Sequence, residues 1–186
     1  MSHLVPTLET ERLLLKEVTL EHAEAYERHF VNYEVIRHLS AAVPWPYPPG
    51  GVRSFFEEQV LPRQGKERWM WGLFLRSAPR ELIGAVELWR AGIPEHRGFW
   101  LAEERWGMGY MTEACAAVHD FAFERAGFEE LIFSNAVGNH RSSRVKEKTG
   151  AVRIGLQEAR FVDPSLTQSE LWRLRREDWR AAQAGR

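Results

Sequence analysis

The clearest structural signal in the chain lies in the segment Leu101-Ala-Glu-Glu-Arg-Trp-Gly-Met-Gly-Tyr-Met-Thr-Glu-Ala114, where a predicted strand leads into a turn with two glycines and then into a long helix. The first turn of a helix carries backbone N–H groups without partners, and the helix dipole adds partial positive charge there. Gly107 and Gly109 permit positive φ angles and let an anion approach the backbone. The spacing matches neither a Walker phosphate loop nor the dinucleotide-binding Gly-x-Gly-x-x-Gly. The segment therefore predicts either another kind of anion site or a plain tight turn.

Helices and strands alternate along the rest of the chain. We predict helices at 20–30, 35–39, 52–61, 112–126 and 142–149, with turns at 77–80 and 92–94. We predict strands at 12–18, 69–75, 82–89, 98–102, 130–137, 152–157 and 170–174. This alternation predicts an α/β fold, and the consecutive strands in the middle predict a mixed, mostly antiparallel sheet flanked by helices. Without a repeat or a linker, we expect residues 1–186 to form a single domain.

Composition excludes several classes of protein. The chain has 186 residues, of which 44% are hydrophobic and 27% charged, as is typical of globular proteins. Its 25 basic and 26 acidic residues give a net charge of −1, so we expect no nucleic-acid partner. No apolar stretch approaches the ~20 residues of a membrane span, and the N-terminus lacks a signal-peptide pattern. A single cysteine, Cys115, excludes an internal disulfide. We therefore expect a cytoplasmic protein with no membrane partner.

The segment Trp106-Gly-Met-Gly-Tyr-Met-Thr-Glu-Ala114 resembles the coenzyme A pyrophosphate loop of the GNAT N-acetyltransferase superfamily. It is most similar to the Rim-type branch, which acetylates the N-termini of ribosomal proteins, although Met111 stands where the family usually has Ala or Gly. Three further segments resemble that branch: residues 8–15 are similar to its opening strand, residues 139–150 to its Asn-x-x-Ser signature, and residues 171–179 to its closing strand. Ala151 stands where the family usually has Phe after that signature. The resemblance as a whole covers about residues 8–180.

The resemblance implies a V-shaped splay between two central parallel strands, 98–102 and 130–137, with acetyl-CoA lying in it. The main chain of Trp100 and Leu101 would pair with the pantetheine amides, as an added strand would. Other residues would hold the cofactor's pyrophosphate: Trp106, Gly107, Met108, Gly109, Tyr110, Met111 and Thr112. Asn139, which could otherwise be a simple turn or cap residue, would bond to the pantetheine arm, and Ser142 would also contact the cofactor. The resemblance implies no metal.

The implied reaction is direct attack of a neutral primary amine on the thioester in a ternary complex. Ser142, near a helix N-terminus, is the candidate that protonates the leaving thiolate, and it could equally be an N-cap serine. Glu87 and His96 are the candidate bases, since they lie close to the acceptor side of the splay. Glu87 could instead be a solvated or paired strand residue, and His96 a solvated hairpin residue. A water chain could also replace a single base.

His38, Trp45 and Tyr47 are candidate acceptor-binding residues, because the early loop borders the acceptor site in this superfamily. Alternatively, the two loop aromatics cover the edge of the core. The acceptor would be a protein or peptide N-terminus or a small amine. Two other functions stay open: an acyl-CoA-binding sensor or interaction module without turnover, and a phosphate- or nucleotide-binding protein that shares only the glycine loop. Dimerisation is common in such folds, so a homodimer is possible.

Overall fold

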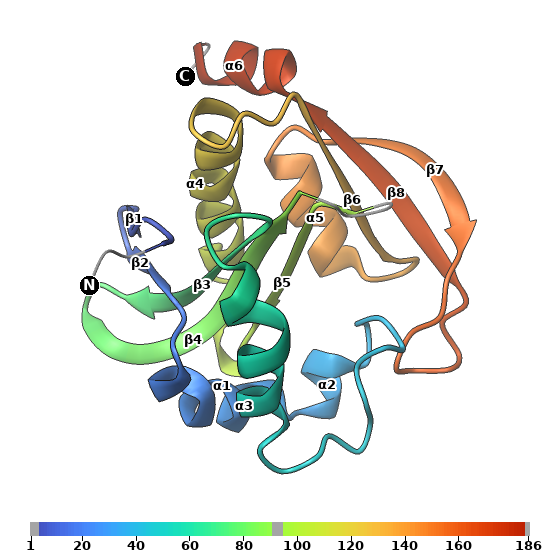
Figure 1. The fold of residues 1–186 in the computed structure, drawn as a ribbon. Helices are drawn as coiled ribbons and strands as arrows, with labels where there is room; N and C mark the ends of the chain where they lie inside the picture. The colour runs from blue at the N-terminus through green and yellow to red at the C-terminus, as the bar shows by residue number, and fades with distance from the viewer. Residues whose placement is uncertain (1–3, 91–94, 185–186) are drawn as a thin grey trace.

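The computed structural model describes residues 4–90 and 95–184, so the turn predicted at 92–94 lies outside the described residues. The α/β class predicted from the sequence is confirmed (Figure 1). The first sheet has the order β1-β2-β3-β4-β5, formed by Leu8–Glu9, Leu13–Glu17, Arg68–Leu75, Ala78–Trp89 and Arg97–Leu101. The second sheet has the order β6-β8-β7, where β6 is Glu130–Ala136, β7 Val152–Glu158 and β8 Gln168–Arg175. The helices are α1 Ala23–Phe30, α2 Tyr33–Ile36, α3 Gly51–Phe55, α4 Tyr110–Glu124, α5 His140–Lys148 and α6 Arg176–Ala184.

The strand pairing corrects one expectation. Every ladder between the described strands is antiparallel, so the mixed sheet with a central parallel pair is wrong. The reason is that β5 and β6 belong to different sheets. At their junction the His96 backbone N–H donates to the Ile132 carbonyl at 2.8 Å, but no ladder follows within the described chain. The edge of β5 opposite β4 is therefore left without a strand partner there.

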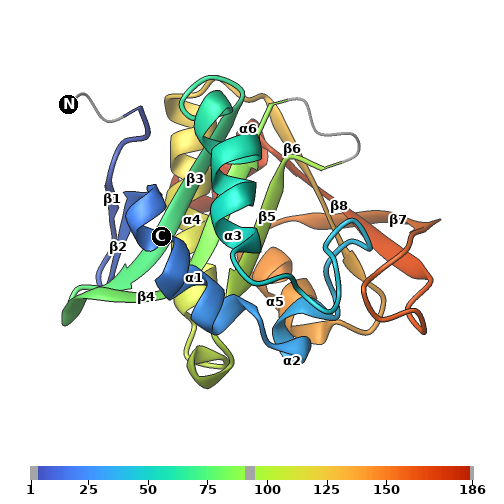
Figure 2. The ribbon, with the colours of Figure 1, turned by 60° about the horizontal axis from the view of Figure 1, so that its bottom comes forward.

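Two hydrophobic clusters cover the two faces of the first sheet. Trp71 and Leu73 of β3 belong to the cluster under α4, whereas their neighbours Met70 and Phe74 belong to the cluster under α1 and α3. Figure 2 shows α1 and α3 on one face of this sheet and α4 on the other. Because side chains alternate along a strand, a strand covered on both faces is apolar throughout, which explains the run at residues 69–75.

Some element boundaries differ from the predictions. The predicted turn at 77–80 is shorter, because β4 already begins at Ala78, which pairs with Leu75. The helix predicted at 52–61 is α3 followed by a π-helical turn at Phe56–Val60. Helix α6 was not predicted; it lies next to the end of α4 (Figure 1). Its Trp179 is buried, and the indole donates to Asp120 of α4 at 2.7 Å. Among the described residues, no helix combines the length and apolar character needed to cross a bilayer.

Candidate active site

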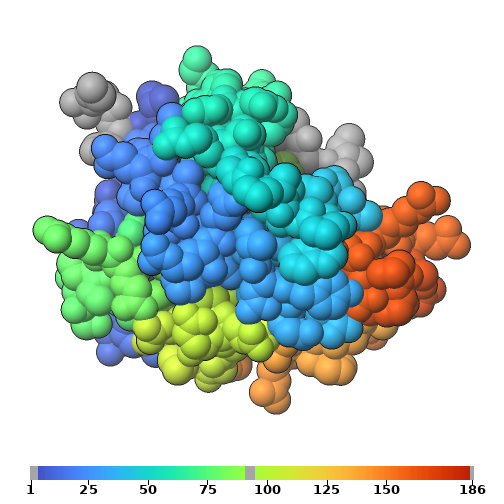
Figure 3. All heavy atoms as spheres, turned by 90° about the horizontal axis from the view of Figure 1, so that it is seen from below, coloured from blue at the N-terminus to red at the C-terminus, as the bar shows by residue number. Residues whose placement is uncertain are grey.

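A pocket of about 510 Å³ opens beside β5. Its walls come from α2 and the residues after it, from β5 and the loop that leads into α4, from the end of β6, from α5, and from the ends of β7 and β8 with the loop between them. Figure 3 shows one face on which the α1–α3 region, the loop before α4 and the α5 region meet, although these segments are far apart in the sequence. Most of the predicted cofactor residues line this pocket: Trp100, Leu101, Trp106, Gly107, Gly109, Tyr110, Met111, Thr112, Asn139 and Ser142.

The two glycines of the loop before α4 are needed for backbone conformation. Gly107 and Gly109 have φ angles of 75° and 80°, and Gly109 is the N-cap of α4. A Cβ atom on Gly107 would meet nothing within 4 Å, so side-chain crowding is not what selects glycine there. The left-handed conformation turns the chain into α4 and leaves the N–H groups of its first turn at the pocket wall.

A set of hydrogen bonds from the β1–β2 turn fixes the start of α4. Thr10 Oγ1 and the Arg12 backbone N–H donate to Glu113 Oε1 at 2.5 and 2.8 Å, and Arg12 Nε donates to Oε2 at 2.7 Å. Arg12 Nη1 also donates to the Met108 carbonyl at 2.9 Å, and its guanidinium lies 4.5 Å from the centre of the Tyr110 ring. Of the predicted loop residues, Met108 lies outside the pocket lining and is 48% exposed. The loop is thus held by residues about a hundred positions away.

We expect Glu113→Gln to lower the free energy of unfolding by about 1–2 kcal/mol at neutral pH, since it weakens a partly exposed charge-assisted network. Burial favours a higher pKa for Glu113, but the bonds from Thr10 and Arg12 outweigh it and lower the pKa. The contribution is therefore present at neutral pH and lost as pH falls through the lowered pKa. Urea denaturation at neutral and acidic pH measures both effects. Glu124→Gln, in an exposed ion pair at the other end of α4, is the control and should change stability less.

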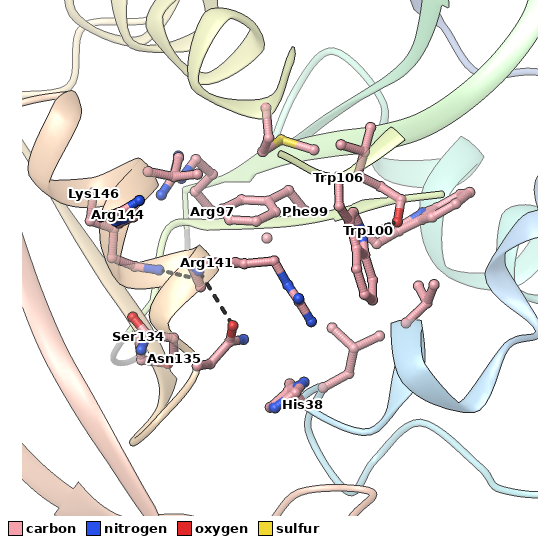
Figure 4. Close-up of a pocket in the computed structure, with 18 of the residues that line it drawn as sticks. His38, Arg97, Phe99, Trp100, Trp106, Ser134, Asn135, Arg141, Arg144 and Lys146 are labelled. Carbon is pink, nitrogen blue, oxygen red and sulfur yellow. Dashed lines mark hydrogen bonds between the residues drawn. The ribbon is translucent and has the colours of Figure 1, made fainter. Parts of the chain in front are cut away.

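Trp106 links the loop to α5. Its indole N–H donates to the Leu101 carbonyl at 2.8 Å, which holds the ring beside the end of β5. The Arg141 guanidinium of α5 lies 3.9 Å from the centre of the same ring. Figure 4 shows Arg141 extending into the pocket between Trp106 and His38. A cation held over an aromatic face in this way is available to a negatively charged ligand.

The start of α5 places Ser142 at the pocket wall. Asn139 is the N-cap, because its Oδ1 accepts from the Ser142 backbone N–H at 3.3 Å, and so the capping role considered for Ser142 belongs to Asn139. The Ser142 side chain accepts a hydrogen bond from Lys146 Nζ at 2.8 Å. Ser142 is 8% exposed and lines the cavity, so its hydroxyl lies at the boundary between the packed interior and the pocket.

The two predicted bases lie outside the pocket lining. The Glu87 carboxylate accepts from Arg68 Nε at 2.8 Å and also forms an ion pair with Arg68 Nη2. His96 Nδ1 accepts the Ile132 backbone N–H at 2.9 Å, which places the proton of the neutral ring on Nε2. Burial lowers the pKa of His96 and favours this neutral form. In this arrangement neither ring nitrogen is free to accept a proton.

Glu95 is the carboxylate that the sequence interpretation missed. It lines the pocket, accepts a hydrogen bond from the Ser134 hydroxyl of β6, and has a pKa raised by burial although Lys146 and Arg97 oppose the shift. A carboxylate with a raised pKa is a stronger proton acceptor than an ordinary one. Glu95 directly precedes His96, one of the predicted bases, but nothing in the local sequence indicates that its side chain faces the pocket.

Of the predicted acceptor residues, only His38 lines the pocket. Burial lowers the pKa of His38, with Arg37 and Arg141 adding to the shift. Trp45 is 43% exposed and packs on Tyr33 with ring centres 5.3 Å apart. Tyr47 packs edge-on against Phe30 at 5.4 Å. These contacts match the alternative in which the loop aromatics cover the edge of the core.

A family model described as the acetyltransferase (GNAT) domain matches residues 12–152. The uncharacterized N-acetyltransferase YoaA of Bacillus subtilis (strain 168) is 28% identical over 155 residues, which are 81% of this chain and 85% of YoaA. The crystal structure of a T. thermophilus protein assigned as an acetyltransferase has a TM-score of 0.76 at 28% identity, over 99% of this chain and 96% of that one.

The structure of RimL, a ribosomal L7/L12 alpha-N-protein acetyltransferase in complex with coenzyme A, is similar in fold, with a TM-score of 0.77 at 16% identity over 91% of this chain and 98% of that one. The family match covers α2, β5, the loop before α4 and α5, all of which line the pocket. By this match, the chain belongs to the acetyltransferase (GNAT) domain family.

Proposed function

We propose that this acetyltransferase transfers the acetyl group of acetyl-CoA to a primary amine by direct attack in a ternary complex. The observation that carries the proposal is one pocket that joins three features: the N-terminus of α4, the unpaired edge of β5, and the Ser142 hydroxyl, with the Glu95 carboxylate in the same lining. An anion site, a strand edge and a proton donor are what the diphosphate, the pantetheine amides and the thioester of this cofactor require.

In this proposal the cofactor lies in a V-shaped opening between β5 and β6. The N–H groups from Gly107 to Thr112 bind the pyrophosphate, and the free main-chain groups of β5 pair with the pantetheine arm. Support comes from the lack of any ladder on this side of β5 within the described residues. Asn139 Oδ1 is already engaged by the helix start, so its amide N–H₂ is the group that we assign to the pantetheine carbonyl.

The chemistry needs a proton acceptor and a proton donor. Glu95 takes the proton of the attacking amine, directly or through a water, because its carboxylate lies in the pocket and its pKa is raised by burial. As the C–N bond forms and the C–S bond breaks, the electron pair stays on sulfur. Ser142 then donates its hydroxyl proton to the thiolate. We assign no proton transfer to Glu87 or His96, because Arg68 and Ile132 occupy the groups that would act.

The charges at the pocket favour some acceptors over others. Its lining contains two acidic residues, Glu34 and Glu95, and six basic ones: Arg97, Arg141, Arg144, Lys146, Lys148 and Arg160. The phosphates of the cofactor account for part of this positive charge, but a polyamine would still be repelled. We therefore propose a peptide amino terminus or a small amine of low positive charge as the acceptor. The coenzyme A-bound RimL structure, whose protein acts on a ribosomal protein, supports the peptide class at the level of fold.

The test is thiol release from acetyl-CoA against a panel of N-terminal peptides, polyamines and aminoglycosides, with calorimetric titration of acetyl-CoA on the same protein. Cys115 is fully buried and its pKa is raised by burial, so it should contribute little background with a thiol reagent. We expect micromolar binding and the highest turnover with uncharged or acidic peptides. Binding without turnover on any amine would instead favour the non-catalytic sensor, and absence of binding would contradict the proposal.

A further inference from the structure

Lys146 is an unusual residue at the pocket, since a lysine is seldom fully buried. It is only 1% exposed, lies one helical turn after Ser142 on α5, and donates to the Ser142 hydroxyl oxygen at 2.8 Å. Both side chains lie at the pocket wall, as Figure 4 shows for Lys146. An ammonium group has donors but no acceptor, so the Ser142 oxygen must accept in this bond. The Ser142 hydroxyl proton is therefore directed away from Lys146 and is free for a group in the pocket.

The surroundings of Lys146 make its proton labile. Burial, followed by the charge of Arg97, lowers the pKa of Lys146 from its usual value to about 7. Arg97 itself is 3% exposed, and its Nε and Nη1 have no hydrogen-bond partner in the described part of the chain. The titratable and charged groups around Lys146 come from several elements: Glu95 before β5, Arg97 on β5, Cys115 and His119 on α4, and Glu170 on β8. Burying two neighbouring cations costs stability, and apolar side chains of similar size would pack there at less cost. Packing alone therefore does not explain why Lys146 and Arg97 are present.

We propose that Lys146 is a positioning residue that orients the Ser142 hydroxyl toward the leaving sulfur and replaces the proton that Ser142 gives up. This inference rests on the proposed function. When the C–S bond breaks, the Ser142 hydroxyl proton passes to sulfur and gives the thiol of coenzyme A. The Ser142 oxygen takes one proton from the Lys146 ammonium, which becomes a neutral amine. Solvent returns a proton to Lys146 before the next turnover.

The direct test is Lys146→Met, which keeps the length of the side chain and removes the donor. We expect kcat to fall by roughly 10²-fold, with little change in the KM for acetyl-CoA. The donor form of Lys146 exists below its pKa, so wild-type kcat should fall as pH rises through that pKa. This loss at high pH should disappear in Lys146→Met and in Lys146→Arg, whose guanidinium does not deprotonate. Glu147→Gln, exposed on the same helix and outside the pocket lining, is the matched control and should retain the wild-type profile.

A double-mutant cycle tests whether Lys146 acts through Ser142. If it does, Lys146→Met should cause no further loss of kcat in a Ser142→Ala background, because the two residues form one donor. Additive losses, or a Lys146→Met variant that keeps the decline at high pH, would overturn the proposal and leave Lys146 a structural residue.

A second readout does not depend on turnover. The thiol of bound coenzyme A can be titrated by the ultraviolet absorbance of its thiolate. We expect the pKa of this thiol to be lower in the wild type than in Lys146→Met, because the Lys146 ammonium strengthens the hydrogen bond that Ser142 donates to the thiolate. Equal thiol pKa values would refute the role of Lys146 even if the enzyme turns over. A lower wild-type value in a protein that acetylates no amine would support Lys146 and contradict the proposed function. Absence of coenzyme A binding would contradict both.

Discussion

Replacing Glu95 by glutamine is expected to lower kcat by roughly 10²- to 10⁴-fold at neutral pH, the range found when a general base is removed. The glutamine oxygen can still accept the Ser134 hydroxyl bond, so the loss should come from the missing carboxylate. Burial raises the pKa of Glu95, and a base acts only in its deprotonated form. Wild-type activity should therefore fall as pH drops through this raised pKa, and the Glu95→Gln variant should lack that acidic decline. Steady-state rates across pH measure both effects.

Glu87→Gln and His96→Asn are the comparison variants, because they change the two bases predicted from the sequence. Asparagine at position 96 can still accept the Ile132 N–H, and glutamine at position 87 can still accept from Arg68. We expect both variants to retain most of the wild-type kcat and its pH dependence. If His96→Asn lost as much activity as Glu95→Gln, or if Glu95→Gln kept the acidic decline, the assignment of Glu95 as base would be wrong.

Substituting Gly109 by alanine is the second change with a large expected effect. At a φ of 80° an alanine is strained, so the variant should lose about 1–2 kcal/mol of stability. A shift of this residue to negative φ would relieve the strain, but it would turn the first N–H groups of α4 away from the pocket. We therefore expect the Kd for acetyl-CoA, measured by calorimetry, to rise by roughly 10-fold or more, the loss of one or two charge-assisted hydrogen bonds.

Gly127→Ala is the matched control for this variant. Gly127 follows the other end of α4, has a φ of 75°, and a Cβ there would meet nothing within 4 Å. It should lose a similar amount of stability, which urea denaturation would measure, and leave acetyl-CoA binding unchanged. If both variants bound acetyl-CoA equally weakly, the loss of binding would follow from the lower stability of α4 alone. That result would contradict the anion-binding role proposed for the loop before α4.

Local patterns predicted a large part of the fold. The strand at 98–102 and the helix that follows the two glycines depend on residues within a few positions of one another, and both were found close to where they were predicted. The helix predicted at 142–149 begins two residues earlier, at His140, with Asn139 as its N-cap. The resemblance of these segments to the GNAT superfamily is confirmed by the family match. The pairing of β5 with β6 could not be predicted from the sequence. Residues that are neighbours in the chain do not show whether these two strands share a ladder or separate after a single backbone hydrogen bond.

Some residues of the candidate site were also predicted from the sequence, and others became visible only in the structure. The loop before α4 was predicted from its two glycines, which have a local signature, whereas Asn139 and Ser142 were predicted from the resemblance of their segment to the GNAT Asn-x-x-Ser signature. Glu95 was missed because nothing near it in sequence indicates that it faces Ser134 across the junction of the two sheets. Lys146 lies four residues after Ser142, a spacing that allows contact on a helix, but its burial against Arg97 depends on how α5 packs on β5.

By itself, the sequence determined the family of this protein, the glycine turn before α4 and the helix that carries Ser142, because each depends on backbone groups and side chains within one or two turns. Only the tertiary structure decided which charged groups come together around the loop before α4 and in the pocket. Arg12 pairs with Glu113 of α4, Glu95 accepts a hydrogen bond from Ser134, and Lys146 is buried away from solvent. These contacts depend on the distance between segments in space and not on their separation in the sequence.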